Sequence, residues 1–412
     1  MLCQFTFENF KSYRDETTFD FQAVEDVTEF PETLIRTEKG TPLLPVSVVY
    51  GPNGGGKSNL LDALICAISL VEMPILNLSS DFEKDSPSRI GSKSLTPFAF
   101  DPASAEKPTS FQLYFRTGAH EFRYCLSILQ ETIFAESLHR KKLGGIRTST
   151  IFERTGGKIT LGTSLRKEGV SREVNPKLPY LSFLTITYHF PVIREVQGCF
   201  ESCLPLYPNL FYFALDGKLL RRKKGEKIDE FNQRKKRIVS ALNSMAIDID
   251  DFRVEKDQTY TSHLTGEKRY ELPLGEESDG TQKILGILPF LLTALDCGGL
   301  VIADELDAKL HPKLLRYLVS LFTNPEINRK GAQLLFTSHD LSIMKSDVFR
   351  RDEIWFSALG KNRSSEIYSL YDLRNEEDQH VSADEAFDKR YLEGRYGADP
   401  YLRQMLSWEA AP

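Results

Sequence analysis

A glycine-rich segment that ends in lysine and serine carries the clearest chemical signal in the chain. It reads Gly51-Pro-Asn-Gly-Gly-Gly-Lys-Ser58 and fits the pattern G-x-x-x-x-G-K-S, after an apolar run and before apolar residues at helical spacing. Glycines let successive backbone N–H groups turn around phosphates, while the lysine reaches the β- and γ-phosphates and the serine ligates Mg²⁺. We therefore expect the following residues to bind the nucleotide: Gly51, Pro52, Asn53, Gly54, Gly55, Gly56, Lys57, Ser58 and Asn59.

A second chemical signal is a pair of acids after a short apolar run. Leu300–Ala303 precede Asp304 and Glu305, so the two carboxylates stand where a buried strand would end. We expect Asp304 to hold the Mg²⁺ shell together with Ser58, and Glu305 to polarise an attacking water as a catalytic base. Taken alone, the same pattern also describes a strand that runs into a solvated turn.

Two further groups are positioned for contact with phosphate. Ser278 and Gly280 open the helical pattern that runs through Ile284–Leu295, where a hydroxyl and free N–H groups face an incoming anion. Ser278 also predicts an ordinary helix cap, and the two roles are compatible. His339 follows the strand-like run Gln333–Thr337; an isolated histidine at such a place is usually structural.

The elements that must position these groups follow from patterning. The first 22 residues alternate like two paired strands, and Leu44–Tyr50 reads as a buried strand followed, beyond the glycine segment, by a helix over Lys57–Leu70. Residues 75–95 read as a loop, and an α/β pattern begins at Leu274. Between them an antiparallel meander is predicted, with strands over Phe98–Phe100, Phe111–Phe115, Glu121–Leu129 and Ile159–Leu161.

Composition limits the class of protein. The chain has 412 residues, of which 41% are hydrophobic and 11% aromatic, with a formal charge of −6, which excludes coating nucleic acid by bulk charge. The apolar stretches Ile284–Leu295 and Leu60–Val71 are too short to span a bilayer, and the N-terminal residues lack a signal-peptide pattern. The six cysteines lack paired metal-type spacing. We expect a soluble cytoplasmic protein without membrane contact.

One segment departs from this mild acidity. Gly217–Arg237 holds ten Lys or Arg against three Asp or Glu, a net charge of +7. We predict a contact surface for nucleic acid or an acidic partner, although such a run is usually a solvated helix face. Asp248-Ile-Asp250 has the D-x-D spacing of a Toprim nuclease metal site; a solvated turn is the simpler interpretation.

The order of these motifs resembles the ABC-type ATPase heads of SMC and DNA-repair proteins, with Leu306-Asp307-Ala308 as the D-loop. A closer resemblance is to RloA-like ATPases, an AAA-labelled bacterial branch linked to restriction loci and abortive infection. The resemblance runs nearly end to end over these segments: Glu8–Tyr13, Gly51–Ser58, Pro97–Asp101, Glu277–Lys283, Asp304–Pro312, Gln333–Asp340, Arg350–Trp355 and Tyr391–Gly397. Gly54-Gly55 stands where the family often has Ala-Ser, and Asp399 where it has Ile; coiled-coil arms are missing.

The resemblance implies an α/β, two-lobed P-loop head with a mixed sheet core and a mostly helical insertion. We expect a first lobe over 1–170, the insertion over 171–262, the remaining core over 263–375 and a tail over 376–412. Ser278 and Gly280 would be a signature that contacts the γ-phosphate of the other subunit, Asp307 would join that site, and His339 would be the switch histidine.

The implied function is ATP and Mg²⁺ binding with ATP hydrolysis, in a homodimer that sandwiches ATP. The chain would be the sensor, scaffold or gate of an anti-phage complex that controls a separate effector, such as a Toprim or RloB-like nuclease. One alternative is an SMC-like or DNA-repair ATPase that acts on DNA. A third is a self-contained nuclease, which the missing carboxylate cluster outside the ATP site disfavours.

Overall fold

The first lobe is built on a seven-stranded antiparallel sheet with the order β2-β1-β4-β5-β6-β7-β8. The computed structural model describes residues 1–78, 95–166, 169–206, 214–215, 217–222, 225–360, 362–375 and 378–398. The strands of this sheet are β1 (Leu2–Glu8), β2 (Thr17–Asp20), β4 (Thr109–Thr117), β5 (His120–Leu129), β6 (Thr132–Lys142), β7 (Thr148–Thr155) and β8 (Lys158–Leu161). Burial alternates along β4 and β5, since one face of the sheet packs on the core. The predicted strand pair is confirmed, as are the meander strands over Phe111–Phe115, Glu121–Leu129 and Ile159–Leu161, whereas β6 and β7 were not predicted.

A second sheet carries the loops of the candidate site. Its order is β16-β15-β3-β14-β13-β9, with β16 antiparallel to β15 and the other pairs parallel. The strands are β3 (Val46–Tyr50), β9 (Cys203–Leu206), β13 (Leu300–Ala303), β14 (Gln333–Thr337), β15 (Ile354–Leu359) and β16 (Ser365–Ser369). Every residue of β3, β13 and β14 is buried, because both faces of this sheet are covered.

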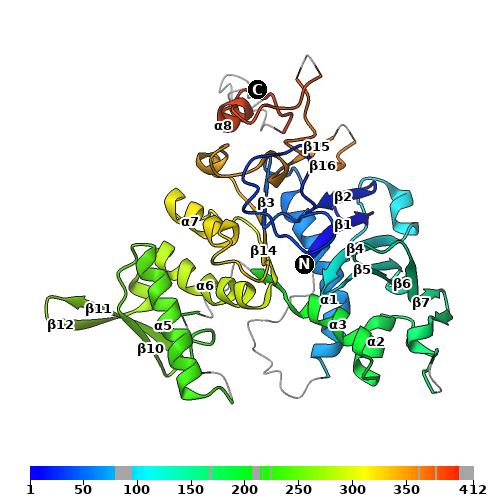
Figure 1. Ribbon diagram of the computed structural model, residues 1–412, viewed down its shortest axis with the longest axis horizontal. Coiled ribbons are helices and arrows are strands. Elements are labelled where there is room, and N and C mark those ends of the chain that lie inside the picture. Colours follow the sequence, from blue (N-terminus) through cyan, green and yellow to red (C-terminus); the bar gives the residue numbers. More distant parts are fainter. Residues whose placement is uncertain are drawn as a thin grey trace, which may run out of the picture.

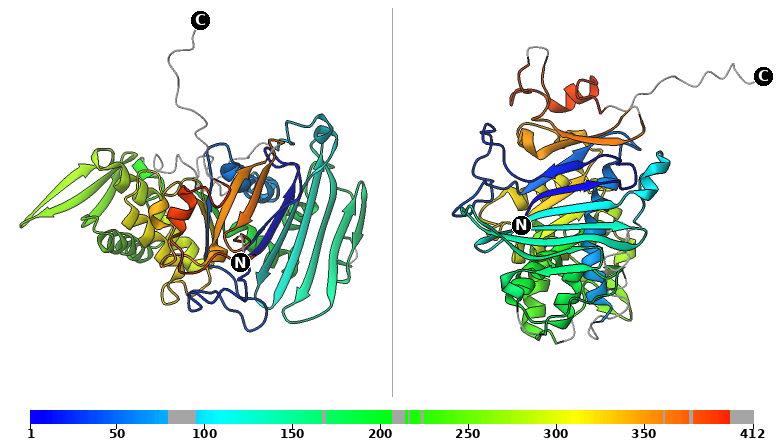
Figure 2. Two further views of the ribbon diagram at one scale, coloured as in Figure 1. Left: turned by 90° about the horizontal axis from the view of Figure 1, so that it is seen from above. Right: turned by 90° about the vertical axis from the view of Figure 1, so that its right-hand side faces the viewer.

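The molecule is layered, and alternate residues of the central strands point into two different cores. Leu300 and Ile302 pack with the antiparallel sheet, whereas Val301 and Ala303 pack on the opposite side. Helix α1 (Lys57–Leu76) fills the first core between the two sheets, with α2 (Tyr180–Thr187) and α3 (Pro191–Glu201) beside it (Figures 1 and 2). The second core is covered by α6 (Asp279–Cys297), α7 (Pro312–Thr323) and α8 (Phe387–Leu392). The predicted two-lobed α/β fold with a mixed sheet core is confirmed.

A smaller unit projects from the side of α6. It consists of α5 (Ile228–Ser244) and the antiparallel sheet β10-β11-β12, with strands over Asp251–Glu255, Gln258–Thr265 and Lys268–Pro273 (Figure 1, lower left). Single-turn helices are found at η1 (Pro102–Glu106), η2 (Thr163–Leu165), η3 (Leu274–Glu276), η4 (Leu341–Ile343) and η5 (Arg351–Glu353).

Segment 171–262, expected as one mostly helical insertion, is divided between two parts of the fold. It contains α2, α3 and α5, but also β10, β11 and the edge strand β9 of the central sheet. Helices α2 and α3 pack on α1 and therefore belong to the core of the first lobe. Strand β9 has only four residues, one of them Pro205, which an edge strand tolerates; its parallel partner β13 lies far away in sequence.

Three local expectations also change. Phe98–Phe100 is not a strand, and the backbone N–H of Phe98 donates to Asn9 Oδ1 at 3.0 Å instead. Helix α1 continues to Leu76, and residues 79–94 of the predicted loop lie outside the described residues. Within the tail, Tyr391 stacks on Phe356 of β15 and the tilted ring of Tyr396 contacts the same residue. Residues 376, 377 and 399–412, Asp399 among them, lie outside the described residues.

Helix α1 is long and apolar enough to cross a membrane by length and composition alone, the one such helix among the described residues. Its apolar side chains pack instead between the two sheets, where Leu60, Leu64 and Ile68 are almost fully buried. This is the pattern of a core helix.

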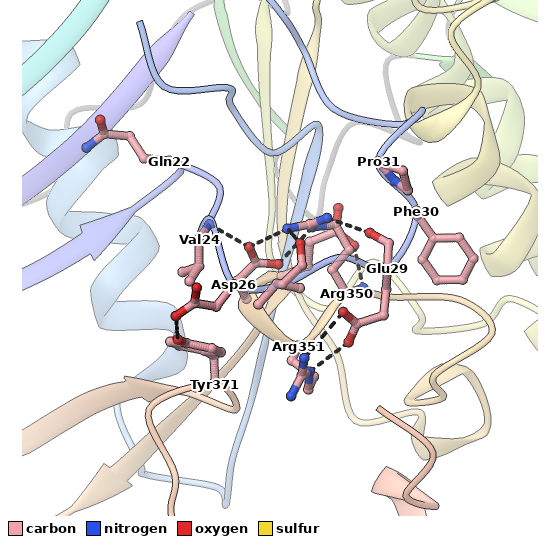
Figure 3. A network of polar contacts seen from close by, with 12 residues as sticks. Gln22, Val24, Asp26, Glu29, Phe30, Pro31, Arg350, Arg351 and Tyr371 are labelled. Atoms are coloured by element: carbon pink, nitrogen blue, oxygen red, sulfur yellow. Dashed lines mark hydrogen bonds and ion pairs between the residues drawn. The ribbon is translucent and has the colours of Figure 1, made fainter. Parts of the chain in front are cut away.

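A buried arginine ties the loop after β2 to the beginning of β15 (Figure 3). Arg350 is fully buried; it forms an ion pair with Asp352 at 2.9 Å and donates to the carbonyl oxygens of Val27 and Glu29. Next to it, Arg351 forms an ion pair with the Glu29 carboxylate at 2.7 Å. Because Arg350 finds acceptors for its planar fork, its charge is compensated inside the protein.

Candidate nucleotide-binding site

The glycine segment forms a loop between β3 and α1 that only glycine can build. Gly51, Gly54 and Gly56 have φ values of 146°, 78° and 111°, in the region that residues with a Cβ rarely adopt. A Cβ on Gly51 would lie 2.1 Å from the carbonyl oxygen of Ser357, whereas nothing lies within 4 Å of such an atom on Gly54. The loop is therefore packed on β15 at one end and open at Gly54, as a cradle for phosphate requires.

Side chains from outside the motif hold this loop. Ser357 Oγ donates to the carbonyl oxygen of Gly55 at 2.8 Å, and Tyr13 Oη donates to that of Gly56 at 3.2 Å. The Tyr13 and Ser357 hydroxyls lie 3.1 Å apart, and burial raises the pKa of Tyr13. Asn59 Nδ2 donates to Ser12 Oγ at 2.8 Å. Sequence reasoning assigned no role to Ser357 or Tyr13, although Glu8–Tyr13 stood out as a motif.

Lys57 and Ser58, at the start of α1, differ in exposure. Lys57 is 6% exposed, and its Nζ donates to the carbonyl oxygens of Gly51 at 2.8 Å and Pro52 at 3.2 Å. Desolvation lowers the pKa of Lys57, while the carboxylates of Asp304, Glu305 and Asp307 act against this shift. The Ser58 side chain is exposed. The ammonium group is therefore held inside the loop, and Ser58 is free to meet a cation at its mouth.

A threonine hydroxyl holds the two acids after β13. Thr337 Oγ1 donates to Asp304 Oδ1 at 2.6 Å and accepts from the backbone N–H of Glu305 at 2.7 Å. Glu305 is exposed and has a φ of 47°, an uncommon value outside glycine that often marks functional loops. The predicted acid pair is thus oriented by Thr337, a residue at the end of β14 that sequence reasoning passed over.

Asp307 and His339 meet beside this pair. Asp307 Oδ2 accepts from the backbone N–H of His339 at 3.0 Å, and Asp307 Oδ1 is buried without a hydrogen-bond partner in the described part of the chain. The His339 side chain is exposed. Because β3, β14 and β13 are parallel neighbours, their carboxyl ends bring the glycine loop, His339 and the acid pair to one edge of the sheet.

Ser278 and Gly280 lie in a different place. Ser278 caps α6, since its Oγ accepts from the backbone N–H of Thr281 at 3.2 Å, which confirms the predicted cap. Both residues line a groove of about 800 Å³ that also holds Lys309 and His311 and that includes no residue of 51–59. The glycine loop of the same chain therefore does not line the groove that holds the predicted signature.

These residues fit Mg²⁺-bound ATP. The glycine loop supplies a cradle that a Cβ would fill, and the N-terminus of α1 has no side-chain cap, so its N–H groups remain available for phosphate. The Ser58 hydroxyl and the Asp304 carboxylate are oxygen ligands of the kind that Mg²⁺ prefers. By contrast, Asp250 accepts from the backbone N–H of Leu264 at 2.6 Å, and the described residues contain no cluster of three or more His, Cys, Asp or Glu for a separate metal.

Four cations of the basic segment, Arg221, Arg234, Lys235 and Arg237, form ion pairs within the described part of the protein. Arg234 pairs with Glu226 at 3.0 Å and Lys235 with Asp251 at 2.7 Å, while Arg237 forms two bonds with Asp296 of α6. Lys223 and Lys224 lie outside the described residues. Lys235 and Arg237 therefore attach α5 to acids outside the segment, whereas the Arg234–Glu226 pair lies within it and leaves the net charge of +7 unchanged.

A protein-family model matches the part of the chain that carries these residues. Residues 46–345 match the family described as "AAA domain, putative AbiEii toxin, Type IV TA system". The chain belongs to this family. The matched range begins at the first residue of β3 and includes the glycine loop, the start of α6, the acid pair and His339. This AAA domain is therefore a P-loop ATPase domain of the AAA type.

Several solved structures of low sequence identity align with most of the chain. An SMC head bound to the C-winged helix domain of ScpA has 13% identity and a TM-score of 0.46, covering 90% of this chain and 97% of that chain. The recombination mediator RecF has 12% identity and a TM-score of 0.36, covering 90% and 98%. An ATP-binding cassette of an ABC transporter in its ADP conformation has 13% identity and a TM-score of 0.34, covering 95% and 99%. No curated protein matches the chain.

Proposed function

We propose that this AAA domain hydrolyses ATP with Mg²⁺ and that it does so as a two-fold dimer of heads. The observation that carries the proposal is the edge of the central sheet where the glycine loop, the Thr337-held acids and His339 come together. P-loop ATPases use the same kinds of groups to hold phosphates, bind the metal and orient a water.

In this proposal each side chain has one task. Lys57 moves from the loop carbonyls to the β- and γ-phosphates. Ser58 and Asp304 would hold Mg²⁺, which would supply positive charge for the phosphate oxygens. Glu305 orients the attacking water and accepts its proton, a role that its exposure to solvent permits. His339 contacts the γ-phosphate from the neighbouring strand.

The dimer follows from the separate groove at Ser278 and Gly280. A hydroxyl and N–H groups at the N-terminus of α6 suit a phosphate, but residues 51–59 do not line their groove. A two-fold arrangement would bring this groove to the nucleotide of the partner head and complete two equivalent sites.

The cellular role is proposed from the family description and from the RloA-like resemblance. We infer that the ATPase gates an anti-phage complex of the abortive-infection type and controls a separate effector, such as a Toprim or RloB-like nuclease. Co-purification of a nuclease that is released or activated by ATP would support this role. DNA-stimulated turnover without such an effector would instead favour an SMC-like role on DNA.

ATP turnover and molecular mass test the enzymatic proposal. Glu305→Gln should bind Mg·ATP, lose about 100-fold or more in turnover, and accumulate as a dimer with ATP. Ser278→Arg should bind ATP but neither dimerise nor hydrolyse it. Near wild-type turnover by Glu305→Gln, or hydrolysis by a strictly monomeric protein, would refute the proposed site.

A further inference from the structure

One lysine of α6 is directed at the backbone of the loop that carries the acid pair. Lys283 Nζ donates to the carbonyl oxygens of Glu305 at 3.0 Å, Leu306 at 2.9 Å and Ala308 at 2.8 Å. An ammonium group has three donors, so these three bonds use its full capacity. Desolvation lowers the pKa of Lys283 to about 8; Asp307 and Glu305 oppose this shift, and Lys309 adds to it.

The loop over 304–309 is held from two sides by different chemistry. Its N–H groups at Glu305 and Leu306 donate to Thr337 of β14, whereas its carbonyl groups turn to Lys283. Two of its residues, Glu305 and Lys309, have φ values of 47° and 64°. Such backbone persists only where the surroundings determine it, and Lys283 supplies much of that determination.

The position of Lys283 in α6 links the predicted signature to the loop that carries Glu305. Lys283 lies in the second turn of α6, and Ser278 and Gly280 at the start of this helix line the groove described above. A displacement of the start of α6 would therefore be transmitted through one side chain to the backbone of Glu305. In addition, Lys309 forms an ion pair with Asp279 at 3.0 Å and joins the same two elements at the surface.

We propose that Lys283 is a positioning residue that couples the signature end of α6 to the loop bearing Glu305. When Ser278 and Gly280 of one head contact the ATP bound to the partner head, Lys283 aligns Glu305 of the first head with the ATP in its own glycine loop. This inference rests on the proposed dimeric ATPase. It assigns to Lys283 an effect on turnover but no contact with nucleotide.

Steady-state kinetics and nucleotide binding of the full chain test the positioning role, at pH 7 so that Lys283 stays charged. Lys283→Met should lower kcat by about tenfold or more and leave the Kd of Mg·ATP within about twofold, because the glycine loop is untouched. Lys283→Arg keeps a charged donor and should recover most of kcat. Lys158→Met, at an exposed lysine of β8, is the matched control and should behave like wild type.

A double-mutant cycle with Ser278→Ala tests the coupling itself. If the two residues act through one unit, the double variant should lose little more kcat than the more damaging single variant. Additive losses in the cycle, or turnover of Lys283→Met within about twofold of wild type, would overturn the inference. So would a Lys283→Met variant that loses ATP binding as much as turnover.

Two controls separate the role of Lys283 from an effect on folding and from a failure of the proposed ATPase site. If Lys283→Met melts at a lower temperature, Lys283→Arg and Lys283→Gln carry the test, and a kcat that follows only the melting temperature refutes a positioning role. If Lys283→Met turns over ATP at the wild-type rate while Glu305→Gln does not, the inference about Lys283 is wrong and the proposed ATPase site stands. An active Glu305→Gln would overturn the proposed ATPase site.

Discussion

Replacement of Thr337 by valine should disturb the orientation of Asp304 and Glu305 while leaving both carboxylates in the protein. Valine has nearly the same shape and Thr337 is fully buried, so the core around β14 is retained. The substitution removes the hydroxyl that donates to Asp304 at 2.6 Å and accepts from the Glu305 N–H at 2.7 Å. Both groups then depend on water or on a shifted loop.

The size of the effect follows from these two bonds. A polar group left without its buried partner costs about 1–3 kcal/mol, and both groups here are only partly buried, so we take about 1–3 kcal/mol for the pair. If that cost appears in the transition state, in which Glu305 must be aligned, kcat falls by about 5- to 150-fold, since about 1.4 kcal/mol corresponds to tenfold. Binding of Mg·ATP should weaken less, because Lys57 and the glycine loop are unchanged.

The assay is ATP turnover of wild type, Thr337→Val and Thr337→Ser, with the melting temperature of each. Serine restores the hydroxyl and should recover most of kcat. A folded Thr337→Val enzyme with turnover within about twofold of wild type would show that the bridge does not orient the acids, and the reasoning from these two bonds would fail.

Three further outcomes are expected. Asp304→Asn should weaken Mg·ATP binding as well as turnover, unlike a change at the catalytic base, and titration of binding against Mg²⁺ checks this. Gly51→Ala should abolish nucleotide binding, because its Cβ would lie 2.1 Å from a β15 carbonyl, whereas Gly157→Ala, in an open turn, should bind normally in the same assay. Burial, reinforced by a neighbouring carboxylate, raises the pKa of Glu72 from 4.5 to about 8. The folded state therefore retains a proton that the unfolded chain releases, so stability should decrease as pH rises from about 4.5 to 8. In melting curves across this range, Glu72→Gln should make that decrease shallower, and an unchanged slope would contradict the assignment. Glu353, whose pKa is also raised to about 8, should maintain part of the slope.

Local patterns in the sequence were enough for every part of the site that is contiguous in the chain. The strand, glycine loop and helix around Gly51–Ser58 follow one another, and the positive φ values occur at glycines that the sequence displays. The cap at Ser278 depends on a residue only three positions away. The burial of β13 on both faces is visible in its uninterrupted apolar run.

Contacts between distant segments were decided only by the tertiary structure. The sequence pattern gives no reason why Thr337 should bridge Asp304 and Glu305, why Ser357 and Tyr13 should support the glycine loop, or why Lys283 should meet three carbonyl groups. Serine, threonine, tyrosine and lysine are common polar residues, so their types carry little information about their partners.

The same limit explains the difference at β9. Four residues with a proline carry no periodic signal, and their strand exists because they pair with β13 at the edge of a sheet formed from distant parts of the chain. A pattern in sequence reports interactions a few residues apart, such as caps, turns and the alternation of apolar faces. Pairing of strands and the direction of single polar side chains depend on how the sheets and helices pack, and that is settled only when the whole domain folds.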